Sequence, residues 1–238
     1  MVPSRRSLKA RCKAGLKQAL QFILPGRWII WRGRKDGQAI ALTFDDGPHP
    51  EWTPKVLDTL LAFKAKATFF LVGEKTRKYP EIVHRIAGEG HEIGNHTHSH
   101  RVLSGLSTAQ IHEEIELGAQ AIQACIGTSP NLIRTPKGVQ SLRSFRYLLA
   151  HHLTAVAWSV DPEDFMAESA ETILAKVERQ LVGSGDIILL HDKNRHTIDA
   201  LPRLLAMIQN RGLETVALSH YLVPRGKSPG KGCRRGML

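Results

Sequence analysis

Short apolar runs alternate with longer amphipathic segments between residues 39 and 217. The apolar runs predict seven strands, at Ala39–Phe44, Ala67–Val72, His91–Asn95, Asn131–Arg134, Thr154–Val160, Asp186–Leu190 and Glu214–Ala217. Between them, apolar positions at helical spacing predict helices near Pro54–Phe63, Pro80–Ala87, Thr108–Cys125, Leu142–His151, Glu168–Leu181 and Thr197–Asn210. Strands that alternate with helices in this way predict an α/β fold, either a parallel barrel or a doubly wound sheet.

Two adjacent carboxylates follow the first predicted strand. In Thr43-Phe44-Asp45-Asp46-Gly47-Pro48, Asp45 and Asp46 stand where the apolar run gives way to a Gly-Pro turn. Neighbouring carboxylates repel each other, and both stay ionised only when a cation or an arginine lies nearby. The pair therefore indicates either a binding site or a solvated Asp-Gly turn.

Three histidines alternate after the third predicted strand, in Asn95-His96-Thr97-His98-Ser99-His100. His96 and His100 are four residues apart, so one helical turn or a tight loop can direct both imidazoles at one ion. Asp46 can supply a third ligand. Two imidazoles and one carboxylate with an open position are typical of a catalytic metal site, whereas the alternative is an exposed polar loop.

The motifs together resemble the polysaccharide deacetylases of carbohydrate esterase family four, also called the NodB-homology domain. Lys137 stands where the family has an aromatic residue, and Phe165 stands where it has tryptophan. Five family motifs occur in the family's order, at Thr43 to Gly47, His96 to His100, Arg134 to Gly138, Asp161 to Phe165 and Ile187 to Asp192. The resemblance implies a distorted, incomplete (β/α) barrel. Because each motif follows a predicted strand, we expect an active site at the carboxyl ends of about seven parallel strands.

The resemblance also implies roles for the polar residues. Asp46, His96 and His100 are expected to hold a divalent metal, by default Zn²⁺, although Co²⁺ or Ni²⁺ also suits such ligands. Such a metal activates water and polarises the acetyl carbonyl. Asp45 is expected to act as the general base and His191 as the general acid.

Two further residues are expected to support this pair. A guanidinium at Arg134 would hold Asp45 ionised and oriented, although a surface ion pair is the alternative for this arginine. The resemblance points to Asp164 as the partner that keeps His191 protonated, with Asp161 as the second choice.

Four residues are expected to contact the substrate: Pro136, Lys137, Phe165 and Leu189. In the family, the main-chain N–H at the position of Lys137 helps to hold the oxyanion, and a backbone donor survives replacement of the side chain. Phe165 and Leu189 can form an apolar niche for the acetyl methyl group.

The expected function is therefore a metal-dependent hydrolase that removes N-acetyl groups from an amino-sugar polymer or oligomer, such as a chitooligosaccharide or peptidoglycan. One alternative is a deformylase or deacetylase of a lipid-linked amino sugar. Another, from a different class, is a catalytically silent carbohydrate-binding barrel.

Charge is concentrated in the two ends of the chain. Of the net charge of +11, residues 1–35 contribute ten Lys or Arg and no acid, and residues 224–238 contribute five and no acid. The remaining residues carry 18 basic and 22 acidic side chains, so no nucleic-acid partner is expected for the core. Three well-separated cysteines indicate neither a disulfide framework nor a cysteine metal site.

These features predict three regions: a basic amphipathic segment at 1–37, a catalytic domain at 38–223 and a basic disordered tail at 224–238. Residues 1–35 suit either peripheral contact with an anionic membrane or packing on the barrel, with Trp28 and Trp31 against the core. The apolar run Phe22-Ile23-Leu24 is too short for a signal peptide, and no stretch approaches the roughly 20 apolar residues of a membrane span. The expected location is the cytoplasm or the periphery of the cytoplasmic membrane.

Overall fold

The structure is a computed structural model that describes residues 28–35, 37–180 and 182–222. The amphipathic pattern at residues 8–23 and the predicted tail at 224–238 lie outside these described residues. Within the described ranges, no helix combines the length and the apolar character needed to cross a bilayer.

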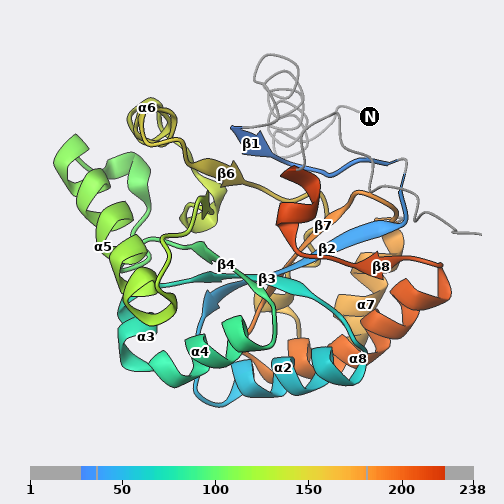
Figure 1. Cartoon of the computed structure of the whole chain (residues 1–238). Helices are drawn as coiled ribbons and strands as arrows, with labels where there is room; N and C mark the ends of the chain where they lie inside the picture. Colours follow the sequence, from blue (N-terminus) through green and yellow to red (C-terminus); the bar gives the residue numbers. More distant parts are fainter. Residues whose placement is uncertain (1–27, 36, 181, 223–238) are drawn as a thin grey trace, which may run out of the picture.

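A single parallel sheet forms the centre of the molecule (Figure 1). Its strands are β1 (Ile29–Ile30), β2 (Ala39–Gly47), β3 (Ala67–Leu71), β4 (Glu92–Asn95), β5 (Leu132–Ile133), β6 (Thr154–Val156), β7 (Ile187–His191) and β8 (Glu214–Thr215). Their order is β1-β6-β5-β4-β3-β2-β7, and β8 pairs with β2 outside this path. All seven predicted strands are present. The pairing of β1 with β6 was not predicted, because two apolar residues have no recognisable period.

The sheet closes on itself through the residues that follow β6. Val160 pairs with Ile188 of β7, and the Leu189 N–H donates to the Val160 carbonyl at 3.0 Å. The strand predicted at Thr154–Val160 is therefore interrupted, since β6 ends at Val156 and only Val160 pairs again. This closure by a single bridge confirms the predicted distorted barrel.

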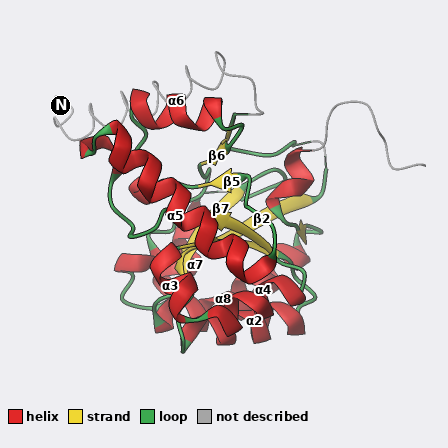
Figure 2. Ribbon diagram, turned by 60° about the vertical axis from the view of Figure 1, so that its left-hand side comes forward, coloured by secondary structure: helices red, strands yellow, loops and turns green. Residues whose placement is uncertain are grey.

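Helices surround the strands (Figures 1 and 2). They are α2 (Trp52–Ala62), α3 (Gly73–Lys78), α4 (Pro80–Gly88), α5 (Thr108–Ile126), α6 (Leu142–Ala150), α7 (Ala170–Arg179) and α8 (Arg195–Asn210), with short 3₁₀ turns at Leu103–Gly105, Pro136–Gly138, Asp164–Met166 and Leu218–Leu222. All six predicted helices are present. The short helix α3 was not predicted, because its sequence Gly-Glu-Lys-Thr-Arg-Lys has no apolar stripe.

Side chains of β2 alternate between two apolar layers. Ile40, Leu42 and Phe44 pack outward in the largest core cluster, which also holds buried residues of α2 and α8. Ala41 faces the barrel interior with Phe70 and other residues of a second cluster. Because the side-chain period of a strand is two, Thr43 and Asp45 continue the inward-facing row toward the carboxyl end. The strand itself thus directs the first acid of the pair into the barrel.

A close contact between α5 and the loop after β4 supports the predicted metal residues. Gly118 of α5 packs so closely that an added β-carbon would lie 2.5 Å from Asn95 Oδ1 and 2.9 Å from the carbonyl carbon of Thr97. The loop that carries His96 therefore depends on the absence of a side chain at position 118.

We expect Gly118→Ala to lower the free energy of unfolding by about 1–3 kcal/mol, because the new methyl group would displace backbone as well as a side chain. Gly88→Ala is the matched control, since a β-carbon at Gly88 in α4 meets no atom within 4 Å. The control should change stability by less than about 1 kcal/mol. Urea denaturation measures both values, and equal midpoints for the two variants would contradict the expectation.

Candidate active site

A cavity of about 430 Å³ opens at the carboxyl ends of the strands. Asp45 and Asp46 reach it from β2, His191 from β7, and His96 and His100 from the loop after β4. These residues are up to 146 positions apart in the sequence, yet they line the same cavity. The sequence analysis expected the motif residues to meet in this way at the strand ends.

Asp46, His96 and His100 form a compact cluster of candidate metal ligands. Asp46 Oδ1 lies 3.4 Å from His96 Nε2 and 3.0 Å from His100 Nε2. One ligand atom from each residue lies within 4.8 Å of the others. Two imidazole nitrogens and a carboxylate oxygen at this spacing suit a divalent cation of the first transition row.

The tautomer of His96 also suits a metal. Its Nδ1 lies 2.6 Å from the main-chain oxygen of Arg134, and a carbonyl can only accept a hydrogen bond. Nδ1 therefore carries a proton, which leaves Nε2 as the ring nitrogen that faces Asp46. Histidines that bind a metal through one ring nitrogen are commonly oriented by a hydrogen bond from the other ring nitrogen.

The loop that carries both histidines is held in an unusual conformation. Thr97 and His100 have φ angles of 67° and 59°, and Asp46 has a φ angle of 72°. Asn95 stabilises the loop, because its side chain accepts from the Thr97 N–H and donates to the Ile115 carbonyl of α5, both at 2.8 Å. Backbone strain of this kind persists only where surrounding contacts enforce it, and it is common at functional sites.

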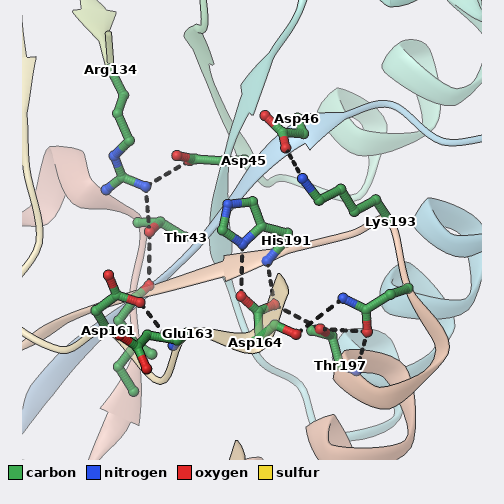
Figure 3. A network of polar contacts seen from close by, with 12 residues as sticks. Thr43, Asp45, Asp46, Arg134, Asp161, Glu163, Asp164, His191, Lys193 and Thr197 are labelled. Carbon is green, nitrogen blue, oxygen red and sulfur yellow. Dashed lines mark hydrogen bonds and ion pairs between the residues drawn. The ribbon is translucent and has the colours of Figure 1, made fainter. Parts of the chain in front are cut away.

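Lys193 is a neighbour of this cluster that the sequence analysis missed. Its ammonium lies 2.5 Å from Asp46 Oδ2 (Figure 3). Burial would raise the pKa of Asp46, but hydrogen bonds from His100, His96 and Lys193 outweigh it and hold the pKa far below its usual range. Asp46 is therefore an anion. The only sequence signal for Lys193 is its place two residues after His191.

Asp45 forms a buried ion pair with Arg134. Arg134 Nη1 donates to Asp45 Oδ1 at 2.7 Å and to Thr43 Oγ1 at 2.8 Å (Figure 3). Its guanidinium also lies 4.3 Å from the ring centre of Phe70. Burial lowers the pKa of Arg134, and the charge of Asp45 opposes this shift. The second oxygen of Asp45 lies 3.8 Å from His96 Nε2, so one oxygen faces the ligand cluster.

His191 forms a second dyad with Asp164. Its Nδ1 lies 2.7 Å from Asp164 Oδ1, while Asp164 Oδ2 accepts from the His191 main-chain N–H at 2.8 Å and from Thr197 Oγ1 at 2.6 Å (Figure 3). Burial alone would lower the pKa of His191, but the hydrogen bond and the charge of Asp164 outweigh it, so the pKa is raised. Asp161 instead accepts from the Glu163 N–H at 2.9 Å.

The rest of the cavity wall is partly apolar. Phe165 is half exposed and meets the His191 ring edge-on at a centroid distance of 5.4 Å, and Leu189 also lines the cavity. Pro136, which was expected to contact the substrate, is buried, and the next residue, Lys137, reaches the cavity. Trp158 is a lining residue that the sequence analysis missed. No sequence signal marked it, because the predicted strand ran on to Val160, whereas β6 ends at Val156.

Comparison with known proteins agrees with this geometry. The sequence model described as polysaccharide deacetylase matches residues 32–156. The chain belongs to the polysaccharide deacetylase family. This membership confirms the family predicted from the five motifs and the class of enzyme, and together with the Asp-His-His cluster it supports a divalent metal.

The alignments with named relatives cover most of this chain. A peptidoglycan-N-acetylglucosamine deacetylase of Bacillus cereus is 38% identical over 206 residues, which cover 82% of this chain and 74% of the relative. A chitooligosaccharide deacetylase of Bradyrhizobium is 35% identical over 192 residues, which cover 74% and 87%. The crystal structure of the Bc1960 peptidoglycan N-acetylglucosamine deacetylase superposes with a TM-score of 0.78 at 35% identity, covering 81% of this chain and 92% of that chain.

The His191 dyad leads to a pH prediction. A raised pKa keeps His191 protonated to higher pH. If His191 is the general acid, its deprotonation produces the fall of kcat/KM at alkaline pH, the alkaline limb of the pH profile. Asp164→Asn removes the charge that contributes most to the raised pKa of His191, so the pKa should fall and the alkaline limb should move to lower pH. Asp161→Asn should leave the position of that limb unchanged, because Asp161 does not contact His191. Equal shifts in both variants would contradict the assignment of Asp164.

Proposed function

We propose that this protein is a metal-dependent hydrolase that removes N-acetyl groups from the amino sugars of a polysaccharide or oligosaccharide, with peptidoglycan and chitooligosaccharides as the substrate classes suggested by its relatives. The observation that carries the proposal is one cavity with three parts: an Asp-His-His ligand cluster, an oriented carboxylate beside it, and a histidine paired with a buried aspartate at the end of β7. Metal-assisted hydrolysis of an amide uses these three groups to activate water, to accept its proton and to protonate the departing amine.

Asp46, His96 and His100 would hold the metal. A divalent cation at this position supplies Lewis-acid activation of water and of the acetyl carbonyl. Zn²⁺ is the proposed ion, because two imidazoles and one carboxylate with an open position form a common catalytic zinc set. The proton transfers are assigned to amino-acid side chains, as follows.

Asp45 would remove the proton from the attacking water. Arg134 holds one of its oxygens at 2.7 Å, while the other faces the ligand cluster. A carboxylate that is fixed on one side and available on the other suits a general base, because its orientation needs no reorganisation during the reaction. Arg134 is a positioning residue in this scheme.

His191 would donate a proton to the departing amine, which is a poor leaving group without one. The charge of Asp164 maintains the protonated form, and Thr197 in turn orients Asp164. The main-chain N–H of Lys137 is proposed to stabilise the oxyanion, and Leu189 with Phe165 to receive the acetyl methyl group. Contact of residues 1–35 with an anionic membrane stays a prediction from sequence.

The division of roles between the two acids can be tested by substitution. Asp46→Ala, His96→Ala and His100→Ala should each lose both bound metal and acetate release, because each removes a ligand. Asp45→Asn should retain the metal and lose about 10²- to 10⁴-fold in kcat, the range expected for a general base. Elemental analysis and an acetate-release assay on chitooligosaccharides and peptidoglycan fragments measure the two properties. Near-normal turnover by metal-loaded Asp45→Asn would refute the base assignment.

Metal removal tests the choice of ion. Treatment with a chelator should abolish acetate release, and addition of Zn²⁺ should restore it in the wild type. Co²⁺ and Ni²⁺ are compared in parallel, because the same ligands accept several first-row ions. Full activity of the chelated protein, with metal analysis showing none bound, would exclude the proposed mechanism.

A further inference from the structure

Two lysines line the cavity from different parts of the sheet. Lys137 follows β5, in the turn Pro136–Gly138, and Lys193 follows β7. Both side chains are exposed, and Lys137 replaces the aromatic residue of the family motif. Neither the methyl of the acetyl group nor the hydroxyl groups of a neutral sugar require an ammonium group at these positions.

The turn that carries Lys137 has a defined position. Lys137 has a φ angle of 58°, which is uncommon for a residue with a side chain. The next residue, Gly138, donates to the Thr135 carbonyl at 2.8 Å and packs so closely on Trp158 that an added β-carbon would lie 2.6 Å from the ring. The strained backbone is therefore enforced by packing, and it presents Lys137 at the cavity.

Lys137 has its charge available for a ligand. Across the described ranges, no acidic side chain lies within ion-pair distance of its ammonium. The acids that line the cavity have other partners: Asp45 is bound by Arg134, Asp46 by Lys193 and the two histidines, and Asp161 by the Glu163 N–H.

The charge balance of the cavity also favours an anion. Three carboxylates, Asp45, Asp46 and Asp161, stand against the three cations Lys137, Lys193 and Arg134, while His191 and Asp164 form a neutral pair when His191 is protonated. The divalent cation of the proposed function would add two positive charges. A cavity with an excess of positive charge attracts anionic substrates.

We propose that Lys137 is a specificity-determining residue that selects amino-sugar substrates carrying an anionic substituent near the N-acetyl group. The inference rests on the proposed deacetylase function and narrows its substrate class. The anion can be a carboxylate on the sugar, as in N-acetylmuramic acid, or a phosphate on the sugar. Both offer oxygens that accept a charge-assisted hydrogen bond from the ammonium.

The test compares kcat/KM for a neutral chitooligosaccharide, for a peptide-free glycan that contains N-acetylmuramic acid, and for N-acetylglucosamine 1-phosphate, whose phosphate is on the carbon next to the one that carries the acetamido group. Lys137→Met removes the charge and Lys137→Arg retains it. Lys64→Met is the control, because Lys64 is an exposed lysine that precedes β3, at the opposite end of the strands. The two anionic substrates separate a carboxylate from a phosphate as the preferred group.

We expect Lys137→Met to lower the ratio of anionic to neutral kcat/KM about tenfold, the size of one charge-assisted hydrogen bond. Lys137→Arg should retain most of the ratio, and Lys64→Met all of it. The wild-type preference should fall as salt is added, whereas that of Lys137→Met should not. Calorimetric binding of the deacetylated anionic product gives a second readout that does not depend on turnover, and its affinity should also fall about tenfold in Lys137→Met.

Two outcomes would overturn the inference. A loss of the same factor on neutral and anionic substrates would show that Lys137 acts on the turn alone, and a wild-type enzyme without preference for either anion would show that its charge is not used. In both cases the wild type still releases acetate from the neutral substrate, so the proposed function would survive. Absence of acetate release from every substrate by the metal-loaded wild type would instead reject the proposed function itself.

Discussion

The site depends on an arginine side chain, Arg134, that is buried inside the barrel. Arg134 is fully buried, and its guanidinium joins Thr43 and Asp45 of β2 to the main-chain carbonyls of Val156 and Ala157, at distances between 2.7 and 3.3 Å. Removing one partner of such a pair costs about 3–5 kcal/mol, because the other charge remains buried without compensation. The contacts that compensate for burying the Arg134 and Asp45 charges also hold Asp45 in a single orientation. The same interactions therefore stabilise the fold and position Asp45.

Parallel strands explain where the polar residues can be placed. Along β2, inward-facing positions change from apolar Ala41 to Thr43 and then Asp45, which lies at the carboxyl end. Deeper in the barrel, a carboxylate would lack both water and a counter-ion. At the strand ends, loops from several strands supply partners, and Asp46 and His100, two of the candidate metal ligands, have left-handed backbone. The fold thus concentrates ionised groups where they can be paired.

The two halves of the site are held by different elements. The histidine loop after β4 is anchored to α3 and α5, through the hydrogen bond of Gly73 N–H to Thr97 and the contacts of Asn95. The His191 dyad is anchored instead to the start of α8, where Thr197 binds Asp164. The candidate ligand cluster and the proposed proton donor therefore rest on separate packing contacts, so substitutions can test the two proposed roles separately.

The sequence alone determined the order of strands and helices, because hydrophobic periodicity reflects which side of each element is buried. Its five short motifs determined the family and the residues that meet at the strand ends. It could not show β1 or α3, which are too short or too polar to have a period. Only the tertiary structure decided which distant side chains touch: Lys193 reaches Asp46 across 147 residues, and Trp158 backs the turn of Lys137. Such contacts depend on how the barrel closes, and closure is a property of the whole sheet.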